Sequence, residues 1–152
     1  MKDIQDEVAL TDRLISNCDK DYEELVLCKI DEDFFEDHIN QRLVNSFLFS
    51  FTKIQDKMGA KVFKKLLIAL KEIDTESVPM LDVLNLLEKL HIIDDVHEWE
   101  KIRELRNNLS HEYFIDIQMS IENIRLSLGQ FARIKEIFFE IKQLIQTRIQ
   151  AK

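Results

Sequence analysis

The scarcity of glycine and proline limits what this chain can fold into more than any other feature of its sequence. Only two glycines and one proline occur among its 152 residues. A β-sandwich or barrel needs turn residues between many short strands, so this class is excluded. Gly59 and Gly129 lie too far apart for a P-loop or a dinucleotide-binding fingerprint. Because 45% of the residues are apolar, intrinsic disorder is excluded as well.

Apolar residues recur at helical spacing along almost the whole chain. The pattern predicts an acidic amphipathic helix within residues 1–30. A second helix, apolar on most sides, is predicted from about Asp33 into the mid-fifties, as expected for a helix buried on several sides. We expect Gly59 to separate it from a third helix over residues 61–73.

Helix-start signals mark the second half of the chain. Ser77 before Pro79 favours a helix start, since proline is tolerated in the first turn. Asp95 with Glu98 three residues later resembles a capping box in front of the next helix. Asp116 can cap a long last helix. No strand pattern is visible, so every predicted element is a helix.

These elements predict a single all-α domain over residues 1–152, an antiparallel up-and-down bundle of five or six helices. Residues 33–150 form the part of the bundle that carries the motif described below. The longest apolar run, residues 66–70, is too short to span a bilayer, and no signal peptide is visible. Cys18 and Cys28 are expected to be reduced packing residues. The chain is therefore expected to be soluble and cytoplasmic, with no membrane partner.

Five phenylalanines gather around the start and middle of the second predicted helix. They are expected to lie in the core or in a dimer interface rather than in a cofactor site. If the face that carries Phe49 is not covered within the monomer, a partner has to cover it. The five residues are Phe34, Phe35, Phe47, Phe49 and Phe51.

The net charge of -8 is unevenly distributed along the chain. Residues 1–40 hold 13 of the 29 acidic residues but only four of the 21 basic ones. The remainder is close to neutral and contains two basic stretches, residues 53–71 and 125–152, that could hold a phosphate backbone. The acidic first helix is expected to face solvent or a basic partner, away from the residues considered next.

One short stretch departs from the amphipathic background, residues 103–113 with the sequence RELRNNLSHEY. Arg106 and His111 suit phosphodiester cleavage, because an arginine fork can hold phosphate oxygens and a histidine can exchange protons near neutral pH. On RNA this chemistry needs no metal or other cofactor, since the 2′-hydroxyl supplies the nucleophile. On a continuous helix the two side chains would point about 140° apart, so a shared cleft requires the helix to end near Ser110 or a second chain to contribute.

The residues alone leave a second interpretation of this stretch open, a helix C-cap with salt bridges. A metal site was also considered around residues 91–98, where two histidines lie among acidic residues. A di-iron bundle needs matching Glu-x-x-His pairs from two helices, and no second set is present. These residues are therefore interpreted as a solvated helix start.

The sequence RNNLSHEY resembles the signature of HEPN domains, an Arg, a polar residue, three variable positions and His. With Tyr113 it matches the Arg-x4-His-x-Tyr form found in HEPN toxins that are paired with a minimal nucleotidyltransferase (MNT) antitoxin. The preceding apolar helix and the acidic break with a tryptophan are also similar to the family's layout. The resemblance covers roughly residues 33–150, of which about eight positions are specific.

This resemblance implies a homodimeric, metal-independent endoribonuclease of a toxin–antitoxin pair. Arg106 would bind the scissile phosphate and His111 would be the general acid/base, with Asn107 and Ser110 in support. Tyr113 would be the residue to which the nucleotidyltransferase attaches AMP. The alternative is a non-catalytic HEPN-like module that docks a nucleotide or the nucleotidyltransferase itself.

Overall fold

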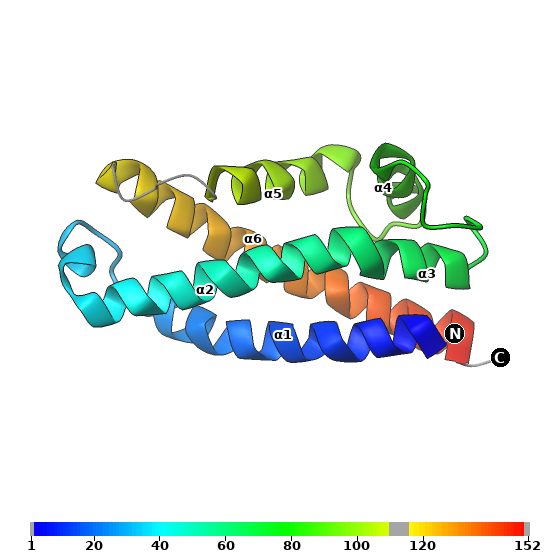
Figure 1. The fold of residues 1–152 in the computed structure, drawn as a ribbon, viewed down its shortest axis with the longest axis horizontal. Coiled ribbons are helices and arrows are strands. Elements are labelled where there is room, and N and C mark those ends of the chain that lie inside the picture. Colours follow the sequence, from blue (N-terminus) through cyan, green and yellow to red (C-terminus); the bar gives the residue numbers. More distant parts are fainter. Residues whose placement is uncertain (1, 110–115, 151–152) are drawn as a thin grey trace.

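The computed structural model describes residues 2–109 and 116–150, which form five helices and contain no strand (Figure 1). The all-α prediction is confirmed, and α2, η2 and α3 together make one continuous helix. The elements are α1 (Lys2–Val26), η1 (Asp33–Glu36), α2 (His38–Lys57), η2 (Met58–Val62), α3 (Phe63–Ala69), α4 (Met80–Lys89), α5 (Val96–Leu109), α6 (Ile117–Leu144) and η3 (Ile145–Gln150).

The long helices run alternately up and down the molecule (Figure 1). Helix α1 runs from right to left in this view, the continuous helix α2–α3 runs back, α5 runs to the left again and α6 returns to the right. The short helix α4 packs on α3 and on α5. Both marked chain ends therefore lie at the same end of the bundle, as an up-and-down arrangement requires.

The continuous helix α2–α3 lies at the centre of the bundle and packs against α1, α5 and α6. Phe47, Phe51, Ile54 and Met58 are all 0% exposed, which explains why this segment is apolar on most sides. Phe47 also contacts Phe131 of α6 edge-to-face, with the ring centroids 5.7 Å apart. Burial of this helix on several faces positions every residue of the groove described below.

The predicted break at Gly59 is wrong. Residues 58–62 are π-helical, so the chain widens its hydrogen-bonded turn and continues in the same direction into α3. Gly59 is buried, and a Cβ at this position would lie 3.6 Å from Nε1 of Trp99. The glycine therefore serves close packing of α5 against the central helix rather than a turn.

Several predicted helix starts are confirmed. Asp95 accepts a hydrogen bond from the Glu98 amide at 2.9 Å, and Asp116 accepts one from the Met119 amide at 3.2 Å. The second helix begins later than the predicted Asp33, because residues 33–36 form a separate 3-10 turn and Asp37 then caps α2 by accepting from the Ile39 amide at 2.9 Å.

The shortage of glycine is visible at the ends of α3 and α4. Lys71 and His91 both have a φ of 62°, the left-handed conformation that glycine usually supplies after a helix. At each end a backbone hydrogen bond runs back five positions, from the Glu72 amide to the Leu67 carbonyl and from the Ile92 amide to the Leu87 carbonyl, both at 2.9 Å. This is why the third helix ends before the predicted residue 73.

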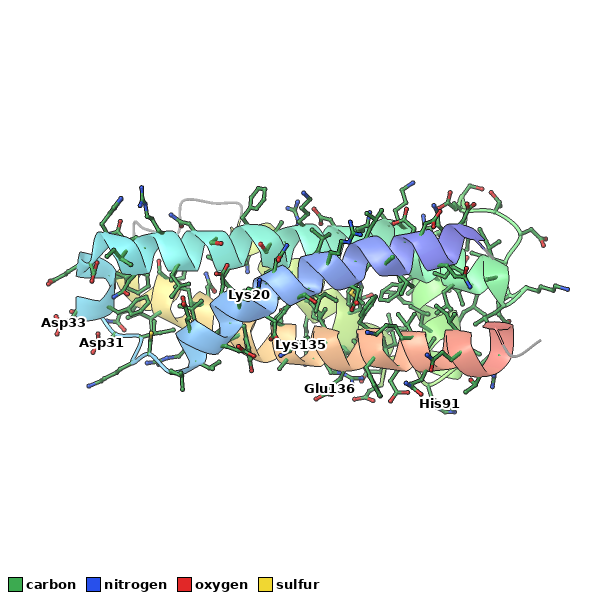
Figure 2. The ribbon with its side chains drawn as sticks, turned by 90° about the horizontal axis from the view of Figure 1, so that it is seen from below. Lys20, Asp31, Asp33, His91, Lys135 and Glu136 are labelled. Atoms are coloured by element: carbon green, nitrogen blue, oxygen red, sulfur yellow. The ribbon has the colours of Figure 1, made fainter. Side chains whose placement is uncertain are left out.

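The acidic helix α1 finds its basic partner within the same chain. Asp19 accepts from Nζ of Lys135 at 2.7 Å, and Asp12 from Nζ of Lys142 at 3.1 Å, where α6 faces α1 (Figure 2). The expectation that the 125–152 stretch is available for a phosphate backbone is therefore wrong for these lysines. Arg125 and Arg133 of the same stretch are also engaged, with the Ile30 carbonyl and with Glu98.

The two cysteines differ from each other. Both are free, but only Cys18 is buried; Cys28 is exposed beyond the end of α1, so its predicted packing role is wrong. Burial, together with the charges of Asp21 and Asp19, raises the pKa of the Cys18 thiol to about 12, which keeps it protonated. In the part of the chain that the structure describes, no helix is both long and apolar enough to cross a membrane.

Glu7 of α1 ties the first helix to the central one. Nζ of Lys57 lies 3.0 Å from its Oε2 and Nζ of Lys65 lies 3.3 Å from its Oε1. Burial opposes ionisation of this carboxyl, but the two lysines outweigh burial and lower its pKa below the ordinary value of 4.5. The ionised form is thus favoured in the folded chain, and its contribution to stability is lost as pH falls.

We predict that Glu7→Gln lowers the free energy of unfolding by about 1–3 kcal/mol at pH 7, because two half-buried ammonium groups lose their partner. The difference in unfolding free energy between the variant and wild type should shrink as pH falls below 4.5, because the Glu7 carboxyl of the wild type then takes up a proton and loses its charge. Urea unfolding at several pH values measures this. Glu23→Gln, an exposed acid on the same helix, is the control, and an equal effect of both variants would contradict the assignment.

Candidate functional site

A groove between the central helix and α5 contains the part of the predicted motif that the structure describes. Two hollows, of about 450 Å³ and 360 Å³, lie along it and share Asp56 and Arg106 as a common wall. We name them the Phe49 hollow and the Trp99 hollow. The Phe49 hollow is lined by Asn45, Leu48, Phe49, Thr52, Lys53 and Leu109 besides the shared pair, and the Trp99 hollow by Gln55, Gly59, Ala60, Lys64, Met80, Trp99, Arg103 and Asn107.

Helical periodicity explains why these residues meet. On the central helix they recur every three or four positions from residue 45 to residue 64, and on α5 from residue 99 to residue 109. Each set therefore forms one stripe, and the two stripes face each other. The buried residues Leu105 and Ile102 lie between the α5 positions and anchor this helix to the core.

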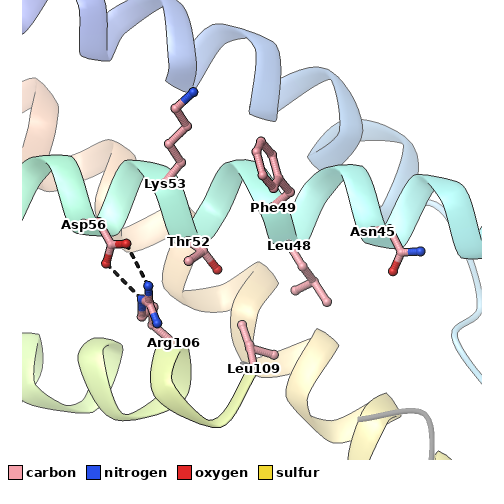
Figure 3. A pocket seen from close by; sticks show the side chains of 8 residues that line it. All are labelled: Asn45, Leu48, Phe49, Thr52, Lys53, Asp56, Arg106 and Leu109. Atoms are coloured by element: carbon pink, nitrogen blue, oxygen red, sulfur yellow. Dashed lines mark hydrogen bonds and ion pairs between the residues drawn. The ribbon is translucent and has the colours of Figure 1, made fainter. Parts of the chain in front are cut away.

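Arg106 and Asp56 form the ion pair that divides the groove (Figure 3). Nε of Arg106 donates to Oδ1 of Asp56 and Nη2 donates to Oδ2, both at 2.9 Å, so the contact is bidentate. The hydrogen bonds to Asp56 raise the pKa of the guanidinium above its ordinary value against a smaller opposing effect of burial. Both side chains remain partly exposed, with 30% for Arg106 and 50% for Asp56.

The pair holds Arg106 in one orientation without using all of its donors. A guanidinium has five N–H groups, and Asp56 accepts from two of them. No other described residue accepts from this side chain. Two N–H groups of Nη1 and one of Nη2 are therefore left over on a side chain that lines both hollows, where an anionic ligand could accept from them.

The Phe49 hollow is largely apolar. Leu48 and Leu109 approach each other from α2 and α5, and Phe49 projects from the neighbouring side of α2 (Figure 3). The Phe49 ring is 70% exposed, whereas Phe34, Phe35, Phe47 and Phe51 are buried in the core. Nζ of Lys53 lies 5.9 Å from the Phe49 ring centroid. Four of the five phenylalanines therefore lie in the core, and Phe49 is the one that the monomer does not cover, for which the prediction requires a partner.

The Trp99 hollow is polar and positively charged. Arg103 is exposed and Lys64 half-buried, and no carboxylate of the described residues lies within ion-pair distance of either. Trp99 lines it and packs edge-to-face on Phe63, with the ring centroids 4.6 Å apart. Three of the residues that line this hollow are cationic, Lys64, Arg103 and Arg106, and one is acidic, Asp56. The hollow therefore favours anions.

The predicted site residues fall into two groups. Arg106 and Asn107 lie in the last two turns of α5 and both line the groove. Ser110, His111 and Tyr113 lie outside the described residues. Helix α5 is described as far as Leu109, so the expected approach of His111 to Arg106 is not part of the described geometry.

Sequence reasoning missed Asp56, the partner of Arg106. Fifty positions separate the two residues, so no local motif connects them. The signal that could have found it is its isolation, because Asp56 is the only acidic residue among the six lysines of residues 53–71. Trp99, Lys64 and Arg103 were likewise not assigned to a site.

The residues around 91–98 serve structural contacts. Glu98 accepts from Arg133 of α6 and from the Asp94 amide, the latter at 2.7 Å, and His97 lies 3.5 Å from Glu100. Across residues 2–109 and 116–150, no three His, Cys, Asp or Glu side chains gather as a metal site would require.

Comparison of the chain with protein-family models, with curated proteins and with solved structures finds no match. The functional argument therefore depends on the residues of the groove and of the motif alone.

Proposed function

We propose that this protein is a cytoplasmic, metal-independent endoribonuclease toxin of the HEPN type. The observation that carries the proposal is Arg106, the first residue of an Arg-x4-His-x-Tyr motif, which Asp56 holds in a groove while three of its N–H donors have no described acceptor. A guanidinium fixed in this way can bind a phosphodiester without first being ordered. The rest of the motif follows the last described residue of α5 directly.

The proposed reaction uses the RNA's own 2′-hydroxyl as nucleophile. Its oxygen attacks the adjacent phosphorus while a base removes the proton, and the bond to the 5′-oxygen breaks as that oxygen receives a proton. His111 is the proposed general acid/base, because imidazole exchanges protons near neutral pH. Arg106 would stabilise the charge that builds on the phosphate oxygens, and Asn107 and Ser110 would support the pair. The products are a 2′,3′-cyclic phosphate and a 5′-hydroxyl.

The proposal includes a homodimer and a partner enzyme. Phe49 exposes an aromatic ring at the edge of the groove, and a second copy of the chain would remove it from water. In the dimer two copies of the motif would face a shared cleft. An MNT-type nucleotidyltransferase is the proposed antitoxin, with Tyr113 as the residue that receives AMP.

We predict that the purified protein cleaves RNA in the presence of EDTA. His111→Ala and Arg106→Ala should each lower the rate about 10²–10⁴-fold, because each removes a group that acts in the transition state. His97→Ala is the matched control, since His97 lies exposed at the start of α5 and lines neither hollow. Circular dichroism should show unchanged helical content for all three variants.

Cleavage that persists in both motif variants, or that EDTA abolishes and added metal restores, would refute this mechanism. RNA binding without cleavage, and expression toxicity that His111→Ala does not relieve, would instead indicate the non-catalytic binding module. The nuclease proposal requires relief of toxicity by this substitution.

The dimer is tested by Phe49→Ser. This substitution should convert the dimer to a monomer in size-exclusion chromatography with light scattering, because it removes the exposed aromatic contact. Phe139→Ser is the control, as Phe139 is 56% exposed on α6 and belongs to neither hollow. A wild type that is monomeric at all concentrations, or a Phe49→Ser variant that dimerises as wild type does, would contradict the proposal.

A further inference from the structure

The Trp99 hollow contains two buried polar atoms without a hydrogen-bond partner in the described structure. Nε1 of Trp99 belongs to a side chain that is 0% exposed, and Oε1 of Gln55 to one that is 4% exposed. Both residues line the hollow. A buried donor or acceptor that forms no hydrogen bond is costly, so such atoms are expected to meet a ligand or water.

The indole N–H of Trp99 lies beside Gly59, which also lines the hollow. A Cβ at Gly59 would lie 3.6 Å from Nε1 of Trp99 and 3.8 Å from Cε of Met80, so the absent side chain leaves room for about one methyl group beside the N–H. At about 360 Å³ the hollow is far larger than the roughly 30 Å³ that one water molecule occupies in the liquid. It can therefore admit a group of several heavy atoms.

Three cationic side chains line the same hollow. Lys64 comes from α3 and Arg103 from α5, while Arg106 contributes the donors that Asp56 leaves over. Arg103 lies about one helical turn after Trp99 and one turn before Arg106. These three side chains of α5 therefore lie on one face of the helix. Donors of fixed position and net positive charge are what a phosphate group requires.

We propose that the Trp99 hollow is a phosphate-binding subsite for the polynucleotide backbone. Trp99, Lys64 and Arg103 would hold a second phosphate next to the one bound at Arg106. This deepens the proposed function, since it assigns the path of the RNA along the groove. The Phe49 hollow, on the other side of the ion pair, is left to the partner copy.

The chain provides its own probe, because Trp99 is its only tryptophan. A ¹H–¹⁵N spectrum contains a single indole resonance, which reports a hydrogen bond at Nε1. Titration with a 2′-O-methyl RNA decamer, which lacks the nucleophile and cannot be cleaved, should shift this resonance downfield in a saturable manner. Inorganic phosphate should shift it in the same direction at much higher concentration.

Two matched pairs of variants locate the site. Arg103→Gln and Lys64→Gln should each weaken decamer binding about tenfold, whereas Lys101→Gln, which removes an exposed charge from the same helix outside the hollow, should leave it within twofold. Gly59→Ala places a methyl group against the indole N–H at ordinary contact distance and should abolish the shift. Gly129→Ala, where nothing lies within 4 Å of the added carbon, should not.

An indole resonance that ignores the decamer, or equal effects of Arg103→Gln and Lys101→Gln, would overturn the subsite. A response to inorganic phosphate alone would overturn its assignment to the RNA backbone. Failure of the subsite and failure of the proposed function are distinguishable. If the protein cleaves RNA but the indole resonance does not shift, the nuclease proposal stands and the subsite is refuted. If the resonance shifts but no RNA is cleaved, the hollow binds the RNA backbone and the nuclease proposal is refuted.

Discussion

Burial of the central helix on three sides is the constraint on which the rest of the structure depends. Helices α1, α5 and α6 all pack on it, and its residues Phe47, Phe51 and Ile54 are 0% exposed. The π-helical turn at residues 58–62 keeps the helix continuous past Gly59. That continuity places Asp56 and Lys64 in one line opposite α5. Without it, the two hollows would not adjoin a common ion pair.

The distribution of charge follows from the same packing. Glu7, Asp12 and Asp19 of α1 neutralise lysines of the central helix and of α6 that would otherwise form basic patches. The more exposed pairs of Asp12 and Asp19 contribute little stability individually. Their larger effect is on where positive charge remains. In the part of the chain that the structure describes, it remains in the groove, at Lys64, Arg103 and Arg106, on the side away from α1. The net negative charge of the whole chain therefore does not indicate the charge of the groove.

Most of the fold follows from periodicity and caps, while the site follows only in part. The stripes of α5 and α6 and the caps Asp95 and Asp116 could be predicted because they depend on neighbouring residues. Gly59 misled the prediction, since local propensity favours a break where tertiary packing against Trp99 requires a small residue. Asp56 could not be paired with Arg106 in advance, because the contact joins residues on different helices.

The chemical identity of the RNA ends tests the central claim most directly. A short RNA incubated with the protein in EDTA can be analysed by mass spectrometry, with a second substrate that carries a single 2′-deoxy sugar at the scissile position. The account predicts a 2′,3′-cyclic phosphate and a 5′-hydroxyl from the first substrate and no cleavage at the deoxy position of the second. Products with a 5′-phosphate and a 3′-hydroxyl, or cleavage at the deoxy position, would contradict it.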